Sequence, residues 1–193
     1  MSGCLDAAPI NGCSIDACAT AAARFDGQSC IGVSGLFAEG APEALTLEFW
    51  VLADVPGAEG VILDFADHMG AADGGGPATM TGFQLALDAG ALVYTEGHGG
   101  APDSVSAASA AFSVGNWHHI AIVRSAQDAD TAALEFFMDG EPLGVESLAV
   151  GALSALNVPD SLWLGCSRGD EGAPESFFAG EVDGVRVSEG VRY

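Results

Sequence analysis

The chain has 193 residues, with 27 acidic side chains against five basic ones, all arginine, and a formal net charge of −22. This balance argues against nucleic acid or an anionic membrane surface as a partner, since affinity for both comes largely from Lys and Arg that neutralise phosphates. The length suits one packed domain, and no run of about 18 apolar residues predicts a transmembrane segment. The acidity has two interpretations: a solvated surface suited to salty or calcium-containing surroundings, or acidic rim loops that bind cations.

Residues 1–22 are expected to form an irregular leader that holds three of the five cysteines, Cys4, Cys13 and Cys18. The first of them follows a Ser-Gly pair, and this start is similar to the end of a bacterial lipobox, in which the cysteine becomes the lipidated first residue. Cys4 is therefore a candidate lipidation site. A lipid anchor there would place the protein on the bacterial cell surface.

The cysteine count also bears on the compartment of the protein. An odd number in an exported chain leaves one thiol to explain, and lipidation of Cys4 would leave four cysteines that can pair in three ways. The pairing we expect is Cys13 with Cys18 and Cys30 with Cys166, the second bond joining an early strand to a late one. The alternative is that all five thiols are reduced in a cytoplasmic protein.

From residue 23 to residue 193, short apolar runs alternate with glycine-rich breaks, which is typical of many strands in one sandwich domain. The expected strands cover residues 23–25, 30–33, 45–53, 61–66, 82–88, 91–96, 117–125, 133–139, 161–166 and 180–187. Two longer breaks, at 67–81 and 98–110, are expected to be functional or mobile loops. The one exception to the strand pattern is a turn near residues 147–156.

Alternation of side chains predicts which strand faces are buried. In residues 45–51 every odd position is apolar, whereas Thr46, Glu48 and Trp50 share the other face, so this strand is expected to be half-buried. Residues 134, 136 and 138 repeat the pattern. The Asp139-Gly140 pair that follows them predicts a tight hairpin turn.

Six phrases, taken together, resemble the laminin-G-like, concanavalin-A-type jelly roll of bacterial surface proteins and phage structural proteins. They are ARFDG at 23–27, LTLEFWV at 45–51, GNWHHIAIVR at 115–124, FFMDGEPLG at 136–144, LWLGC at 162–166 and FAGEVDGVRVSEGVRY at 178–193. Their order and spacing agree over the whole stretch. The resemblance implies an all-β antiparallel β-sandwich, and it implies recognition without naming a ligand.

The adjacent histidines of the GNWHHIAIVR phrase raise the question of whether they are metal ligands or a catalytic pair. In the family that this phrase resembles, the segment is a core strand that follows a tight turn. Here His118 shares a strand face with Ile120 and Ile122, whereas His119 shares the opposite face with Ala121. Because neighbours in a strand point to opposite sides of the sheet, the two imidazoles cannot chelate one ion together. We expect structural roles for both.

Glycan-active enzymes of the concanavalin A type carry two glutamates in a Glu-x-Asp-x-Glu arrangement, which sets acid and nucleophile on one strand face for retaining chemistry. No such segment occurs in this chain. The nearest approach is Glu181-Val182-Asp183, in the stretch where the family places its closing strand. We therefore expect no catalytic residues and a protein that is not an enzyme.

Calcium (Ca²⁺) is the expected cofactor, because hard cations take several oxygen ligands from acidic loops. In the pentraxin branch of the fold, a calcium site is built from a loop after an early strand and an acidic loop before the last strands. The corresponding stretches here are residues 63–76 and 164–185. The resemblance thus implies four rim ligands: Asp67, Asp73, Asp170 and Glu171.

The paired Asp-Asn and Gln-x-Asp patterns of the pentraxin branch are missing, which argues against binding of two ions. A second candidate cation site is a clasp between terminal strands made by Asp26 and Asp183. In the alternative interpretation, Asp26 makes a turn hydrogen bond and Asp183 pairs with Arg186 or Arg24.

Aromatic rings matter for a glycan ligand, because sugars stack on exposed rings. Tyr94, Trp50 and Trp163 all lie in expected strands, where an inward ring is simply core. The concave face of the jelly roll is the usual glycan surface in the family. Trp50, which shares a face with Thr46 and Glu48, is the expected ligand-binding ring on it.

Together these features predict a non-catalytic recognition or adhesion domain that works outside the cytoplasm and binds glycan or protein through calcium-dependent rim loops. The alternative is a structural protein of a virion, such as a capsid decoration or tail component. It arises because the ending GVRVSEGVRY also resembles phage-encoded laminin-G-like domains.

Overall fold

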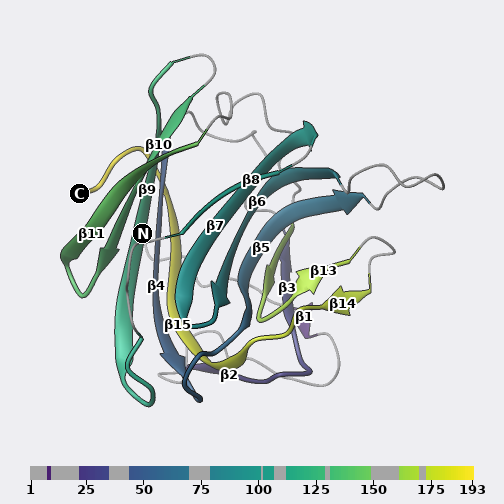
Figure 1. The fold of residues 1–193 in the computed structure, drawn as a ribbon. Coiled ribbons are helices and arrows are strands. Elements are labelled where there is room, and N and C mark those ends of the chain that lie inside the picture. The colour runs from purple at the N-terminus through teal and green to yellow at the C-terminus, as the bar shows by residue number, and fades with distance from the viewer. Residues whose placement is uncertain are drawn as a thin grey trace.

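The computed structural model describes the backbone of residues 8–9 and residues 22–34, 44–69, 79–100, 102–106, 112–128, 131–148, 161–169 and 173–193. All regular structure in these ranges is β-strand, and none of them forms a helix long and apolar enough to cross a membrane. Two antiparallel sheets lie face to face (Figure 1). The predicted all-β jelly-roll sandwich is confirmed.

The first sheet has seven strands in the order β1-β3-β12-β5-β6-β7-β8. Their bounds are Ala8–Pro9 for β1, Ile31–Ser34 for β3, Ser161–Leu164 for β12, Gly60–Met69 for β5, Thr79–Asp88 for β6, Ala91–Gly100 for β7 and Asp103–Ser106 for β8. Strand β1 belongs to the expected leader and pairs with β3. After β12, a short hairpin is formed by β13 (Ser167–Arg168) and β14 (Pro174–Glu175).

The second sheet has six strands in the order β11-β10-β9-β4-β15-β2. Their bounds are Glu141–Leu148 for β11, Ala132–Met138 for β10, Trp117–Ala126 for β9, Ala44–Ala53 for β4, Ala179–Glu189 for β15 and Ala23–Asp26 for β2. The last strand of the chain therefore lies between two early strands, so segments far apart in the sequence pair side by side.

One hydrophobic core fills the space between the sheets. The odd positions of β4 from residue 45 to residue 53 are all buried, whereas Trp50 on the other face is 45% exposed. From the seven-stranded sheet, the Phe83 ring stacks between Phe65 and Tyr94, at centroid distances of 4.7 and 5.8 Å. Each such side chain contributes about 1.5 to 3 kcal/mol by leaving water, which makes the alternation the main determinant of the fold.

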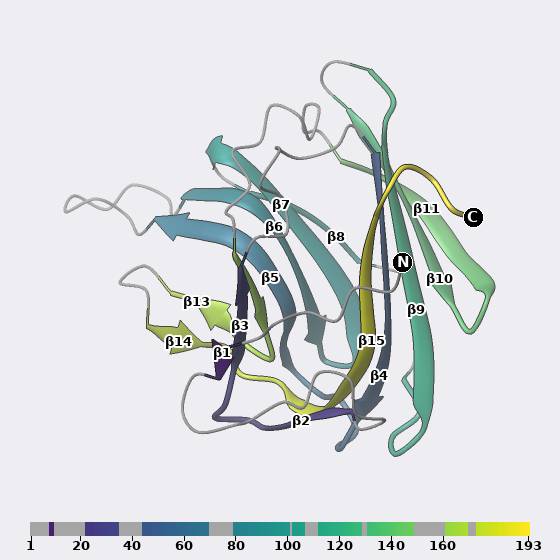
Figure 2. The same ribbon diagram turned by 180° about the vertical axis from the view of Figure 1, so that it is seen from behind.

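The seven-stranded sheet is curved, so that its outer face is concave. Strands β5, β6 and β7 bend away from the six-stranded sheet, and the β13–β14 hairpin lies on the concave side (Figures 1 and 2). Strand register shifts between Val61 and Leu63 and between Met80 and Thr81, and bulges of this kind bend a strand. Gly82 lies at the second shift with φ +117°, where a Cβ would collide with a carbonyl oxygen of β5.

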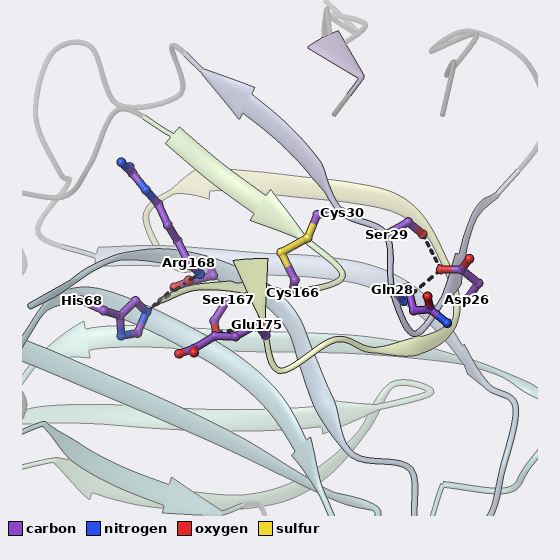
Figure 3. The surroundings of a disulfide bond; sticks show 10 residues. Asp26, Gln28, Ser29, Cys30, His68, Cys166, Ser167, Arg168 and Glu175 are labelled. Carbon is purple, nitrogen blue, oxygen red and sulfur yellow. Dashed lines mark hydrogen bonds and ion pairs between the residues drawn. A yellow bond between two sulfur atoms is a disulfide. The ribbon is translucent and has the colours of Figure 1, made fainter. Parts of the chain in front are cut away.

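A disulfide between Cys30 and Cys166 ties the start of β3 to the end of β12, as predicted (Figure 3). The bond closes a loop with a sequence separation of 136. Closing a loop of about 100 residues or more removes enough chain entropy from the unfolded state to stabilise the fold by roughly 4 to 5 kcal/mol. Cys4, Cys13 and Cys18 lie outside the described residues, so the second pairing and the lipidation stay predictions.

The sequence pattern misses the edge strands β1, β8 and β11 and the short strands β13 and β14. Strand β8 lies inside the loop expected at 98–110, and the end of β11 overlaps the turn expected near 147–156, the rest of which is outside the described residues. Of the eight residues of β11 only Leu148 is buried, so its sequence carries little of the alternation from which strands are predicted. The expected loop at 67–81 is also shorter, because β5 and β6 extend into it.

Two hairpins close through two-residue turns. Asp139-Gly140 joins β10 to β11 with φ of 53° and 84°, and the predicted turn is thereby confirmed. Ala89-Gly90 joins β6 to β7 with φ of 49° and 80°. Positive φ at both positions is the geometry of a type I′ turn, which prefers Asn-Gly or Asp-Gly. Alanine at the first position is strained, since its Cβ disfavours the left-handed region by about 1 to 2 kcal/mol.

Replacing Ala89 with Asn should raise the free energy of unfolding by about 1 kcal/mol, because Asn tolerates the left-handed conformation that alanine resists. Urea unfolding of A89N beside the wild type measures the change. Gly90→Ala is the matched control at the other turn position and should lower the free energy of unfolding. An A89N variant no more stable than the wild type would contradict this account of the turn.

Candidate functional site

The neighbouring histidines of β9 point to opposite faces of the six-stranded sheet, as predicted. His118 Nδ1 lies 2.8 Å from Asp139 Oδ2, and its ring packs edge-on against Phe112 with centroids 5.5 Å apart. His119 lies on the outer face against Trp50, at a centroid distance of 5.1 Å. The two imidazoles have separate partners, which fits the structural roles expected for them.

His118 joins two turns at one end of the sandwich. Its Nε2 accepts the backbone N–H of Ser113 at 3.3 Å, so Nδ1 carries the proton donated to Asp139. Asp139 Oδ1 also accepts the backbone N–H of His119 at 2.9 Å. Burial raises the pKa of the Asp139 carboxyl, but the hydrogen bonds from His118 and His119 outweigh it and hold the pKa below its ordinary value of 3.8.

A buried polar network joins the two sheets further along β9. Arg124 donates to Glu96 of β7 through Nε at 2.8 Å and Nη2 at 2.7 Å, and both side chains are fully buried. The Tyr94 hydroxyl donates to the same carboxylate at 2.8 Å, and His98 Nε2 lies 2.9 Å from it. Burial, with the charge of Glu96, raises the Tyr94 pKa well above its ordinary value. These charged groups are enclosed between the two sheets, where they bind one another, and they do not face a ligand surface.

The concave face of the seven-stranded sheet carries a line of polar and aromatic side chains. The register pairs Trp163 of β12 with Asp64 of β5, Asp64 with Gln84 of β6, and Gln84 with Thr95 of β7. Directly opposed residues of neighbouring strands point to the same side, so these four side chains form a row across the sheet. Trp163, Gln84 and Thr95 are half-buried, whereas Asp64 is fully buried. We call these four residues the concave row.

Asp64 holds the β13–β14 hairpin against this face. Its carboxylate accepts the backbone N–H of Ala66 at 3.1 Å and that of Arg168, on β13, at 2.9 Å. The ring of His68 lies 3.1 Å from the same group, and Figure 3 shows the Arg168 side chain pointing away from His68 and Glu175. Because protein donors occupy the Asp64 carboxylate, it is not open to a ligand, whereas Trp163 and Gln84 are half-buried at the surface of this face.

Trp50 lies on the opposite surface of the molecule. It points outward with Thr46 and Glu48, as predicted, but on the outer face of the six-stranded sheet and not on the concave face. The C-terminal residues cross this sheet: Tyr193 stacks on Phe137 with centroids 5.0 Å apart and donates its hydroxyl to Glu48 at 2.7 Å. The expectation that Trp50 belongs to the concave face is therefore wrong.

Of the four predicted rim ligands for calcium, Asp67 lies within the described residues. It is 52% exposed near the end of β5, and its Oδ1 lies 3.9 Å from Nη1 of Arg168. Asp73, Asp170 and Glu171 lie outside the described part of the chain. The ion pair shows that the two predicted stretches approach each other, but the described residues form no group of three or more potential metal ligands.

The predicted clasp of Asp26 with Asp183 is not formed. The register pairs Asp26 with Ala179 of β15, and Asp183 lies four residues further along, about 13 Å away at 3.3 Å per residue. Asp26 instead accepts the Ser29 hydroxyl at 2.8 Å and the backbone N–H of Gln28 at 2.9 Å. These two hydrogen bonds, that of Ser29 first, lower the pKa of Asp26, which agrees with the alternative of a turn hydrogen bond.

Asp183 also lacks the arginine partner that was suggested for it. Its Oδ1 accepts the backbone N–H of Gly184 at 2.7 Å. Arg24 binds Glu181 at 2.7 Å and Asp54 at 2.8 Å instead, on the outer face of the six-stranded sheet. The strand register thus separates Asp26 from Asp183, and no cation clasp joins the two terminal strands there.

The architecture is that of a lectin-type β-sandwich. Residues 29–192 match a laminin G family model described as the Concanavalin A-like lectin/glucanases superfamily, and the chain belongs to this family. A comparison with curated protein sequences found no match.

Three solved structures show how widely this fold is shared. The CBM40 of Ruminococcus gnavus IT-sialidase, bound to alpha2,3 sialyllactose, is 16% identical with a TM-score of 0.62, covering 89% of this chain and 91% of that chain. Domains LG4-5 of the mouse laminin alpha1 chain are 17% identical with a TM-score of 0.60, and the match covers 88% of this chain and 42% of that chain. A SAP-like pentraxin from Limulus polyphemus is 16% identical with a TM-score of 0.56, and the match covers 85% of this chain and 73% of that chain. At these identities the likeness concerns the fold.

Sequence reasoning misses the concave row. It assigns Trp163 to the core together with Tyr94, and the structure confirms this for Tyr94 alone. Leu162 and Leu164 take the inward positions of β12, so Trp163 turns outward. That alternation is visible in the sequence. The positions of Gln84 and Thr95 beside it arise from strand register, which has no local sequence signal.

Replacing Asp139 with Asn should lower the free energy of unfolding at neutral pH by about 1 kcal/mol, because the amide cannot replace the charged acceptor of His118. Asn tolerates the positive φ of the turn, so the change reports on the charge. The carboxylate has a depressed folded pKa, so its contribution is present above the unfolded value and is lost as pH falls through the folded one.

The difference between D139N and the wild type should therefore shrink below pH 3.8. Urea unfolding across a pH series measures it. Asp88→Asn, at an exposed position beside the other two-residue turn, is the control. A difference between D139N and the wild type that stays constant to the lowest pH would rule out the role given to the carboxylate.

Proposed function

We propose that the protein is a non-catalytic recognition domain that binds a glycan on the concave face of its seven-stranded sheet. The observation that carries the proposal is the concave row, in which the half-buried side chains of Trp163, Gln84 and Thr95 lie on three strands of one face. An aromatic ring offers a surface on which a sugar ring stacks, and amide and hydroxyl groups can exchange hydrogen bonds with sugar hydroxyls.

The spacing of the concave row suits an oligosaccharide better than a single sugar. Neighbouring strands lie about 4.8 Å apart, so Trp163 and Gln84, two strands apart, are separated by about 10 Å. Thr95 lies one strand further. A ligand that reaches from the indole to the hydroxyl therefore needs more than one ring.

The structural neighbours support a carbohydrate ligand, since the CBM40 domain of similar fold is described as bound to alpha2,3 sialyllactose. A non-catalytic role is supported by the positions of the acidic side chains. Glu181, in the segment closest to a catalytic motif, is engaged by Arg24 on the outer face of the other sheet. The concave row contributes a single carboxylate, Asp64, which is buried under protein donors.

We place the protein outside the cytoplasm, because disulfides persist in oxidising compartments and Cys30 pairs with Cys166. A lipid anchor at Cys4 and the alternative role in a virion stay predictions. Trp50 stays the alternative ring for a ligand, on the outer face of the six-stranded sheet.

Two tryptophans on opposite faces make a matched test. Wild-type protein is first screened on a glycan array, and the strongest binder is then titrated by calorimetry. Trp163→Ala should weaken binding by at least about tenfold, which corresponds to 1.4 kcal/mol of lost stacking and burial. Gln84→Ala should weaken binding less, and Trp50→Ala should leave it unchanged. Melting curves establish that each variant is folded.

The concave face would be the wrong site if W163A bound the glycan as tightly as the wild type. Loss of binding in W50A alone would move the site to the six-stranded sheet. An array without any bound glycan would overturn the carbohydrate proposal and favour a protein ligand.

Calcium dependence is proposed for the rim, where Asp67 approaches the stretch that leads into Asp170 and Glu171. The described residues supply one carboxylate there, whereas calcium takes six to eight oxygens. Calorimetry on chelator-stripped protein should show calcium binding, weakened in Asp67→Asn and unchanged in Asp183→Asn. No heat at millimolar calcium and no shift in Tm would refute a calcium site.

A further inference from the structure

Every arginine of the chain has a described position, and this settles where its permanent positive charges lie. The sequence contains five arginines and no lysine. The arginines are Arg24, Arg124, Arg168, Arg186 and Arg192, and all five are described. Carboxylate and sulfate groups of acidic sugars are bound chiefly through such charges, most strongly in bidentate contacts with Arg. The places of these five side chains therefore bear on which glycans the concave face accepts.

Two of the five are held in ion pairs away from the concave face. Arg124 is fully buried between the sheets in its bidentate contact with Glu96. Arg24 lies on β2, at the edge of the six-stranded sheet, and bridges Asp54 and Glu181.

Two more lie on the outer face of the six-stranded sheet. Arg186 of β15 is opposite Glu48 of β4 in the register. Arg192, in the segment that crosses this sheet, has Nε 3.6 Å from Glu48 Oε2. A ligand on the concave face is separated from both by the whole thickness of the sandwich.

Arg168 is the remaining cation, and the carboxylate of Asp67 approaches its guanidinium. Its side chain is 43% exposed on the β13–β14 hairpin, with Nη1 3.9 Å from Asp67. Its backbone N–H donates to Asp64, and Glu175 is exposed on the paired strand β14. The exposed carboxylates of Asp67 and Glu175 thus lie on or beside the hairpin with this one guanidinium, on a protein whose formal net charge is −22.

We infer that the glycan recognised on the concave face is uncharged, and that sialic acid, uronic acid or sulfate on the same oligosaccharide weakens binding. The inference rests on the proposed function. An anionic group over the concave row would meet like charges and would have to compete with Asp67 for Arg168. The preference would therefore differ from that of the structurally similar CBM40, which is described with alpha2,3 sialyllactose.

The test compares matched pairs of glycans, each neutral oligosaccharide beside its sialylated or sulfated derivative, on the full chain. At low ionic strength the neutral member should bind at least about tenfold more tightly, and high salt should narrow the gap because it screens the repulsion. A variant with Asp67→Asn and Glu175→Gln should also reduce the difference in affinity between the neutral and the charged glycan of a pair. Asp183→Asn, an exposed carboxylate on the opposite sheet, should leave it unchanged.

Each pair is measured with calcium and with chelator. Sialylated or sulfated members that bind as tightly as their neutral partners, in either condition, would overturn the inference and leave the glycan proposal standing. If Arg168→Gln then abolished binding of the charged member alone, Arg168 would be its partner. Failure of all glycans to bind would remove the proposed function and this inference with it.

Discussion

The ion pair of Glu96 with Arg124 connects the two sheets from inside the core, and the packing around it requires that both partners be present. Removing both charges from water costs several kcal/mol per ion, and the attraction between them offsets this cost only if the remaining polar atoms are also satisfied. Tyr94 and His98 do this for the carboxylate. Loss of one partner would leave an unpaired buried charge, at a cost of about 3 to 5 kcal/mol. The same pair withdraws one of the five arginines from the surface.

The central strands could be predicted from the sequence because one face of each is buried, so that apolar residues recur at every second position. In β4 the inward positions are all apolar, and β9 is predicted for the same reason by Ile120 and Ile122. The edge strands β8 and β11 could not be predicted, since an edge strand is fixed by hydrogen bonds to one neighbour and needs few buried side chains. Family resemblance predicted the antiparallel jelly-roll sandwich, and the Cys30–Cys166 bond joins an early strand to a late one as expected.

Only those features of the candidate site that depend on a single side chain, such as which way it points from its strand, could be predicted from the sequence. Alternation alone turns Trp50 outward, but which sheet is concave follows from bulges and curvature that span several strands. The concave row is assembled from β12, β5, β6 and β7, and a change of register by one residue would move Gln84 or Thr95 to the inner face. The clasp expected of Asp26 and Asp183 is wrong for the same reason, because the register of β2 and β15 sets the two residues four positions apart.

The Cys30–Cys166 bond also determines how the domain would carry tension. A pull on residue 22 and residue 193 would first act on β2 and β15, which are adjacent in the six-stranded sheet and would separate from it. Once these strands had come away, the covalent bond would take the load, and the loop with its sequence separation of 136 could not lengthen. At about 3.5 Å per residue, roughly 480 Å of chain would stay shielded. A domain built this way would extend only by its terminal segments, so the disulfide sets the length that tension can add to it.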